Sequence, residues 1–424
     1  TTITNHLICA YRVPAYRADV DLVYTNACPT GFIRGGGREV GNFAIERTMD
    51  HLAASLGMDP VELRRRNAIR PEQMPYDTQL GVVYDGGDYI GLLDGVTDAL
   101  GYDQLRSDQA LGAQFGIGVV LSVERTGIGT GEEARVLVHP DGRAHAFLGS
   151  SPGGQGHDTT FAQVVATRLG WPLDRVEVTT GDSDAVPRAA NTAASRSAFE
   201  VGNAAALAGA TARRRLLEKG ADLLEADPAD LVLTPEGIHV RGFSGQHAPL
   251  RELLREGPLE VSETFKRPPA YASACHAAVV EVDGETGSVR IVRYVIGHDS
   301  GRSINPLLLE GQLHGGFAHG LGYALLEEAV YLEDGSFVSS SFLDYLIPGP
   351  PEVDVLPELV MVESEVFDNP EGFKGVGESA TIPAAAAIAG AVEDALRKLG
   401  SKAVVNEIPI TPERLFVALG DGAD

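Results

Sequence analysis

The chain of 424 residues is 44% hydrophobic and 22% charged, the ordinary composition of a globular protein long enough for two or three domains or subdomains. Its 34 basic and 59 acidic residues leave a net charge of −25, which disfavours nucleic acid or an anionic membrane as a partner. No apolar run approaches the roughly 20 residues that cross a bilayer, and the first residues, TTITNHLICAYRVP, show no export signal. The three cysteines form no CxxC pair, which excludes a self-contained iron–sulfur or zinc-thiolate site and predicts a reducing, cytoplasmic compartment.

Helices and strands are both predicted along the chain. Apolar residues recur at helical spacing in 42–57, and a second helix is expected directly afterwards with Asp59 as its cap. Alternating strands are expected on both sides of a Pro-Asp-Gly turn within 134–150, and the same design recurs at 278–297. Between these two strand pairs, the pattern at 157–170 predicts another helix.

Three glycine-rich stretches stand out: RGGGREVG at 34–41, GSSPGGQG at 149–156 and GFKGVGE at 372–378. Each leads into a predicted helix, the last one Ala-rich. A glycine loop at a helix N-terminus presents free backbone N–H groups and the positive end of the dipole, which suits a phosphate or another anionic oxygen. None is a Walker A loop or a dinucleotide fingerprint, since GKS/GKT and a strand-borne GxGxxG are missing. We expect backbone wrapped around a large anionic cofactor, with simple turns as the open alternative.

Four longer motifs carry a more specific signal. They begin RGGGREVGNFAIERTMDHLAASLG, GGQGHDTTFAQVVATRLGWPLDRV, GRSINPLLLEGQLHGGFAHGLG and GFKGVGESATIPAAAAIAG, and NTAASRSAFEVGNAA follows the second. In this order and spacing, over about residues 10–400, the chain resembles the molybdenum-cofactor-binding large subunit of the xanthine oxidase family. The resemblance implies an α+β fold of the xanthine oxidase and aldehyde oxidoreductase type, with two α/β subdomains at 1–112 and 113–424 and without the family's hammerhead domain.

The resemblance also implies roles for individual residues. Glu378 matches a glutamate that stands beside the metal and acts as general base. Gly36 stands where some family members carry an aromatic residue that stacks on a flat substrate. Cofactor contacts are implied at positions spread over the motifs, namely Arg34, Gly154, Gln155, Gly156, Ala194, Ser195, Arg196, Ser197, Gln312, Lys374 and Gly377. The molybdenum itself is expected on the dithiolene of the pterin, with no metal ligand from the protein.

The function that the resemblance implies is that of a molybdopterin-binding subunit in a multi-subunit hydroxylase. Such an enzyme hydroxylates an electron-poor carbon of an N-heteroaromatic compound, or an aldehyde, with oxygen derived from water. The cofactor is expected in its cytosine dinucleotide form, and electrons are expected to pass to 2Fe–2S clusters and FAD in partner subunits. The loop at 34–38 has no cysteine where copper-containing carbon monoxide dehydrogenases carry one, which speaks against carbon monoxide as substrate.

The family's large subunit has a long N-terminal half ahead of the segment that corresponds to YRVPAYRADVDLVYTNACPTG. We interpret the difference as a second polypeptide that supplies that half, with a truncated or processed chain as the alternative. A non-catalytic scaffold subunit that keeps the fold is a second hypothesis, although the presence of Glu378, Gln155 and Gln312 together favours an enzyme. An amidase-type hydrolase, suggested by GSSPGG at 149–154, lacks the further serine and lysine that its chemistry needs.

Overall fold

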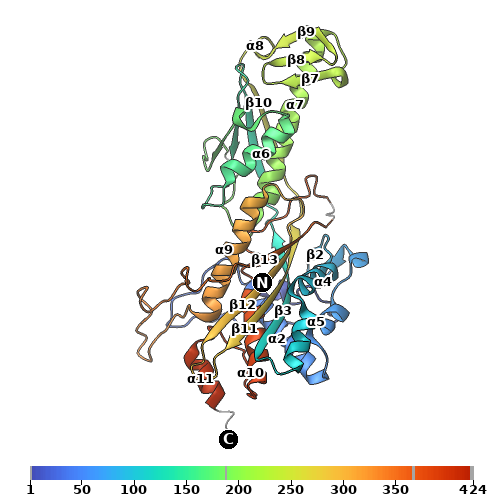
Figure 1. The fold of residues 1–424 in the computed structure, drawn as a ribbon. Coiled ribbons are helices and arrows are strands. Elements are labelled where there is room, and N and C mark those ends of the chain that lie inside the picture. Colours follow the sequence, from blue (N-terminus) through green and yellow to red (C-terminus); the bar gives the residue numbers. More distant parts are fainter. Residues whose placement is uncertain (1, 187–188, 365–367, 421–424) are drawn as a thin grey trace.

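The computed structural model describes residues 2–186, 189–364 and 368–420, and its lower half in Figure 1 is built on a four-stranded sheet. The sheet has the order β13-β12-β11-β3, and its strands are β3 (Phe115–Thr126), β11 (Ala270–Val282), β12 (Val289–Asp299) and β13 (Glu358–Val362). β11 pairs antiparallel with both β3 and β12, while β13 runs parallel to β12. The C-terminal ends of β3, β12 and β13, which come from distant parts of the chain, therefore lie at the same edge of the sheet.

Helices cover both faces of this sheet, because alternate residues of each strand point to opposite sides. On β3, Ile117, Val119 and Leu121 belong to one buried core, and Val120 belongs to another. The helices packed in the first core are α2 (Arg38–Leu56), α3 (Pro60–Asn67), α4 (Tyr89–Leu100) and α5 (Tyr102–Ala110). The helices packed in the second core are α9 (Pro306–Leu325), α10 (Ala384–Lys398) and α11 (Pro412–Gly420).

The segment between β3 and β11 forms a second body, drawn in green in the upper half of Figure 1. Its sheet has the order β10-β4-β5-β6, with strands β4 (Glu132–Val138), β5 (Ala144–Leu148), β6 (Val176–Thr180) and β10 (Leu259–Phe265). Two helices, α6 (His157–Leu169) and α7 (Gly202–Leu224), pack with that sheet in one core. A small sheet at the far end contains β7 (Leu231–Thr234), β8 (Gly237–Val240) and β9 (Phe243–Pro249), with the one-turn helix α8 (Leu250–Leu253).

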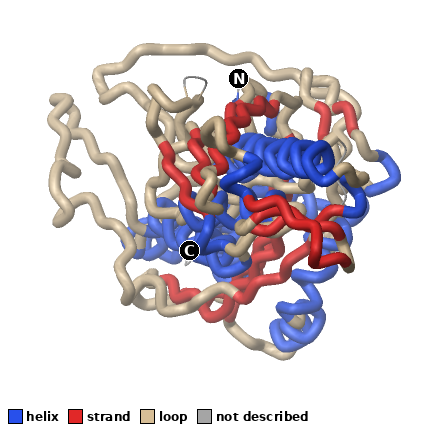
Figure 2. Tube along the Cα trace, turned by 90° about the horizontal axis from the view of Figure 1, so that it is seen from above, coloured by secondary structure: helices blue, strands red, loops and turns tan. Residues whose placement is uncertain are grey.

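Short elements and long loops complete the chain. The short elements are α1 (Thr2–His6), β1 (Tyr76–Asp77) and β2 (Val83–Tyr84). Seen from above, long loops surround the packed helices and strands (Figure 2). Within the described ranges, none of the helices combines the length and the apolar character that a membrane span requires.

The elements expected from sequence are present, and the α+β fold class is confirmed. α2 begins four residues before the predicted helix, because Gly37 with φ 93° ends the preceding loop, and Gly57 with φ 60° stops it as expected. At α3, the Asp59 side chain accepts hydrogen bonds from the next two free N–H groups, at 2.8 and 3.0 Å. The subdomain boundary after residue 112 stays a prediction, and the core of the lower body runs across it, since Leu92 packs in the same cluster as Ile117.

Candidate active site

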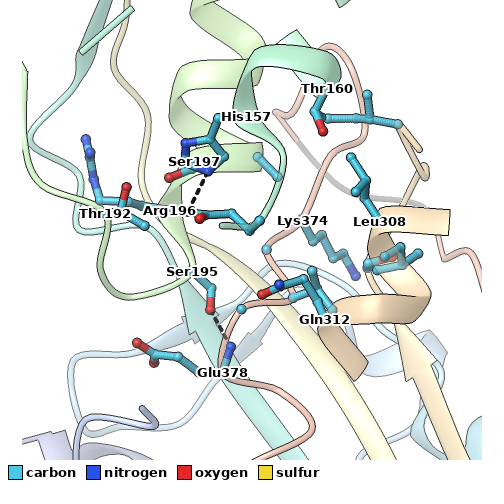
Figure 3. Close-up of a pocket in the computed structure, with 18 of the residues that line it drawn as sticks. His157, Thr160, Thr192, Ser195, Arg196, Ser197, Leu308, Gln312, Lys374 and Glu378 are labelled. Atoms are coloured by element: carbon cyan, nitrogen blue, oxygen red, sulfur yellow. Dashed lines mark hydrogen bonds between the residues drawn. The ribbon is translucent and has the colours of Figure 1, made fainter. Parts of the chain in front are cut away.

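A cavity of about 710 Å³ is lined by residues from both bodies (Figure 3). The lining comes from residues 32–34, the start of α6 with the loop before it, the segment before α7, the segment between β12 and α9 with the first turns of α9, and the loop before α10. The predicted site residues that line it are Arg34, Gly154, Gln155, Ser195, Arg196, Ser197, Gln312, Lys374, Gly377 and Glu378. The other three are not part of the lining: Gly156 and Ala194 each stand between two lining residues in the chain, and Gly36 follows Arg34 by two positions. Folding therefore brings most of the predicted residues to one place.

Glu378 is held in a defined position at this cavity. Its Oε2 accepts a hydrogen bond from Arg38 Nη1 at 2.7 Å, in an ion pair whose side chains are 14% and 6% exposed. Its Oε1 accepts from the backbone N–H of Ala194 at 3.1 Å. A charged donor and a backbone donor both stabilise the ionised carboxylate. The carboxylate is thus held in one orientation at the cavity.

The segment that carries Ser195 fits closely against the Glu378 loop. The Glu378 N–H donates to Ser195 Oγ at 2.9 Å, as the dashed line in Figure 3 shows. Ala194 and Ser195 have φ angles of 52° and 46°, a conformation that costs side-chain-bearing residues about 1 kcal/mol or more. A Cβ on Gly375 would lie 1.9 Å from the Ser195 carbonyl oxygen. Glycine at 375 is therefore required by the close approach of a strained segment to the site.

Arg34 joins three of the predicted motifs. Its Nε donates to the carbonyl oxygen of Gly377 at 2.5 Å, and its Nη2 donates to the Gln312 carbonyl oxygen at 3.1 Å. The Gln312 side-chain oxygen lies 3.4 Å from the same nitrogen. The guanidinium thus links the first glycine loop both to α9 and to the loop that carries Glu378.

Gln155, at the start of α6, has an ordered side chain. Its Oε1 accepts from the Gly153 N–H at 2.5 Å, and its Nε2 lies 2.9 Å from His157 Nε2. His157 Nδ1 lies 3.1 Å from the carbonyl oxygen of Ser150, so Nδ1 carries the ring proton and Nε2 accepts from the amide. Burial lowers the pKa of His157, which agrees with a neutral ring. The amide of Gln155 is held at the cavity wall.

Arg196 is part of the cavity lining, but its guanidinium points into the protein interior. The side chain is fully buried and pairs with Glu132 and Glu200. Beside it, Ser197 Oγ lies 2.7 Å from Ser150 Oγ, which itself lies 2.7 Å from Thr192 Oγ1. A cofactor contact from Arg196 stays a prediction, and with this side-chain placement it would come from the backbone.

The Lys374 side chain is fully buried, and its amine is occupied by partners within the protein. Nζ donates to Asp299 Oδ2 at 2.7 Å and to Ser364 Oγ at 3.0 Å. Burial alone would raise the pKa of Asp299, but the Lys374 charge and the hydrogen bonds from Lys374, Ser364 and the Gly301 N–H together lower it. The Lys374 N–H also donates to the Ser300 carbonyl oxygen at 2.8 Å. The pair therefore anchors the Glu378 loop to the end of β12.

We expect Lys374→Met to reduce the free energy of unfolding by roughly 3 kcal/mol, because it leaves the buried Asp299 carboxylate without a counter-charge. Urea unfolding of the two proteins measures the difference. Arg214→Met is the matched control, since it breaks an exposed ion pair with Glu218 and should cost at most about 0.5 kcal/mol. Equal losses in the two variants would contradict the anchoring role.

Two charged residues of the site were missed by sequence reasoning. Arg38 follows the glycines of the first loop and reaches Glu378 across 340 positions of the chain. Glu124 lies on β3, is 1% exposed, and accepts a hydrogen bond from Ser379 Oγ. A single acidic residue in the apolar run VVLSVE was the available signal for Glu124. Gly36, the predicted substrate position, faces Arg38, whose Nη1 would lie 3.5 Å from a Cβ at that glycine, and its substrate role stays a prediction.

The lining is chemically suited to an anionic, polar cofactor. The first turn of α6 has backbone N–H groups without partners inside the helix. Ser300 Oγ is buried at the cavity and has no hydrogen-bond partner among the described residues. Thr192 and Ser197 add hydroxyl groups to the same wall. A buried, unpaired hydroxyl and free N–H groups at the same cavity are what a ligand with several oxygens would satisfy.

Comparison with known proteins identifies similar sequences. Residues 96–354 match the sequence model of the molybdopterin cofactor-binding domain, and residues 1–68 match a second model of that description. The gamma subunit of the 6-hydroxypseudooxynicotine dehydrogenase complex of Paenarthrobacter nicotinovorans is 33% identical over 96% of this chain and 53% of its own length. The nicotine 6-hydroxylase large subunit of the same organism is 32% identical, with the same coverage of each chain. The chain spans about half the length of these relatives.

Solved structures agree with the sequence matches. Quinoline 2-oxidoreductase from Pseudomonas putida 86 superimposes with a TM-score of 0.90 and 32% identity, over 99% of this chain and 57% of that one. A Cu,Mo-containing carbon monoxide dehydrogenase gives a TM-score of 0.83 and 30% identity, over 91% of this chain and 53% of that one.

Proposed function

The chain belongs to the molybdopterin cofactor-binding domain family, of the xanthine oxidase type, and we propose that it binds the molybdenum cofactor in a multi-subunit hydroxylase. The substrate is an N-heteroaromatic compound, with an aldehyde as the alternative, and the oxygen that is added derives from water. One observation carries the proposal: the Glu378 carboxylate, fixed by Arg38 and Ala194, lies at a cavity built from the glycine-rich motifs.

The residues of the cavity would hold the cofactor without supplying a ligand to its metal. The N–H groups at the start of α6 and the hydroxyls of Ser197, Thr192 and Ser300 suit the oxygens of a pterin phosphate or its cytosine dinucleotide. Gln155 and Gln312, held by His157 and Arg34, would orient it. When bound, the cofactor supplies the two-electron oxidation.

The chain's own contribution to the chemistry is proton removal and orientation. Glu378 accepts the proton that is released when the oxygen is added, as general base. Arg38 and the Ala194 N–H hold the carboxylate in one orientation before the reaction, which avoids reorganisation during it. The ion pair between Lys374 and Asp299 holds the loop that carries Glu378 in place.

The choice of an N-heteroaromatic substrate rests on the relatives and on one loop. Two relatives are named for nicotine-type compounds and one structure for quinoline. Carbon monoxide dehydrogenases match as well, but residues 34–38 of this chain read RGGGR, without a cysteine. We therefore exclude carbon monoxide from the proposal. The three cysteines of the chain are unpaired, which supports the cytoplasm as the location.

Partner subunits are part of the proposal. The segments 12–33 and 327–357 expose large apolar side chains, and Leu22, Phe32 and Leu343 are each at least 90% exposed. The two segments meet where the Cys28 N–H donates to the Tyr331 hydroxyl at 3.2 Å. Apolar surface of this extent marks an interface. We assign it to the part of the large subunit that the relatives carry beyond this chain, supplied by a second polypeptide, and we place 2Fe–2S and FAD in further subunits.

The test is to purify the chain with its associated proteins and to determine molybdenum, iron, flavin and the released nucleotide per complex. Molybdenum with iron, flavin and a cytosine nucleotide is the expected result. Quinoline-type substrates in ¹⁸O-labelled water should then give a labelled product. A complex that stays free of molybdenum after cofactor loading would refute the proposal and favour a non-catalytic scaffold.

A further inference from the structure

The site contains a second carboxyl group, that of Glu124, for which the proposed mechanism provides no role. Glu124 is 1% exposed and points from β3 toward the loop of Glu378. Two hydroxyl groups connect the two acids. Ser379, the residue after Glu378, donates to Glu124 Oε2, and Ser195 Oγ, which accepts from the Glu378 N–H, also acts on the Glu124 carboxyl.

The two carboxyls differ in the donors that they receive. Glu378 has an ion pair with Arg38 and a backbone N–H from Ala194. Glu124 forms no ion pair with any described residue, and its Oε1 has no hydrogen-bond donor among them. A charged oxygen that is buried without a donor costs more free energy than a neutral one in the same position. The site therefore favours the charge on Glu378 and the proton on Glu124.

We propose that Glu124 is a positioning residue that holds a proton up to about neutral pH, so that Glu378 alone of the two neighbouring carboxyls is negatively charged below that pH. The effect of Glu124 on turnover rests on the proposed function, whereas the protonation of Glu124 can be tested independently of that function. When Glu124 is neutral, it does not compete with Glu378 for the charge of Arg38. It also places no second negative charge next to Glu378.

The charged groups around Glu124 support this assignment. Arg38 from α2 and Arg34 from the first glycine loop are the cations that act on it, and Glu378 is the anion. Burial and the charge of Glu378 raise the pKa of Glu124 to about 7, against the opposing effects of Arg38, Ser195 and Ser379. The proton is thus held through the acidic range and released close to neutrality.

Infrared difference spectroscopy on the full chain tests the proposal without any cofactor. Between about pH 6 and pH 8, the wild-type chain should lose a neutral-carboxyl band that Glu124→Gln lacks. Other buried acids, such as Asp85 with a pKa raised by burial to about 6, contribute equally to both proteins and cancel in the comparison. Glu177→Gln, at an exposed position on β6, should keep the wild-type band. Identical spectra for wild type and Glu124→Gln would overturn the proposal.

Thermal unfolding gives a second readout with a definite sign. The folded chain holds the Glu124 proton more tightly than the unfolded chain, so the stabilisation from it is present at low pH and is lost as pH rises through about 7. The difference in Tm, Glu124→Gln minus wild type, should therefore increase between about pH 5 and pH 8. A difference that is constant over this range would contradict the proposal.

If Glu124→Gln does not fold, Ser379→Ala replaces it. The Ser379 hydrogen bond favours the ionised form of Glu124, so its removal should move the midpoint of the infrared titration to higher pH. An unchanged midpoint would overturn the assignment. In a loaded complex, Glu124→Gln should also remove the inflection near pH 7 from the turnover profile. If the turnover profile alone did not change as expected, the result would count against the proposed function and not against the protonation of Glu124.

Discussion

Glu378→Gln is expected to lower the turnover of the complete complex by at least about a hundredfold while its molybdenum content stays nearly unchanged. Glutamine keeps the shape of the side chain, and its amide oxygen can still accept from Arg38 or from the Ala194 N–H. What it loses is the ability to take a proton. Both kcat and kcat/KM should fall together, because the interaction that is removed belongs to the transition state.

Glu39→Gln is the matched control for this substitution. Glu39 is a carboxylate of the same loop region, but its two oxygens accept from the nearby Gly37 N–H, at 3.1 and 3.0 Å. We expect its turnover to stay within about tenfold of wild type, since it has no proton to accept in the cavity. Turnover of Glu378→Gln within the same range, at equal molybdenum content, would remove Glu378 from the role of general base.

Gly118→Ala is expected to have the largest effect on stability, at least about 4 kcal/mol or failure to fold. A Cβ on Gly118 would lie 2.1 Å from the Ala387 carbonyl oxygen and 2.6 Å from the Ala391 nitrogen, both in the backbone of α10. Backbone atoms inside a helix cannot rotate aside. The helix would have to move away from β3, and it is joined directly to the loop that carries Glu378.

Gly284→Ala is the control for Gly118→Ala. Gly284 lies in the turn between β11 and β12, and the nearest atom to its Cβ position is a Leu399 methyl carbon at 3.8 Å. This substitution should change the free energy of unfolding by no more than about 0.5 kcal/mol. Urea unfolding of both variants gives the comparison, and similar values for the two glycines would disprove the packing argument.

The contact between α10 and β3 also explains the composition of both elements. Ala384–Ala387 are buried at the start of α10, and Gly116 and Gly118 face the helix from the strand. Small side chains on both sides let a helix backbone approach a strand backbone closely. The sequence shows the alanines and the glycines, but 266 positions separate Gly118 from Ala384, so local patterns do not pair them.

Local patterns predicted the elements of this fold correctly where their cause is local. Asp59 caps α3 and Gly57 ends α2 because the hydrogen bonds and backbone angles involved span only a few residues. The motif resemblance likewise placed Arg34, Gln155, Gln312 and Glu378, and the fold brings them to one cavity. These features can be read from sequence, because short-range chemistry or motif order determines them.

The charge arrangement of the site was decided only by tertiary structure. Arg38 was not singled out as the partner of Glu378, Glu124 was not identified, and Lys374 and Arg196 turned out to hold buried ion pairs. Electrostatic partners are selected by distance in space and by the exclusion of water, and neither is encoded in sequence separation. The sequence by itself thus determined which loops and helices carry the predicted residues, and packing determined which charged side chains pair with one another there.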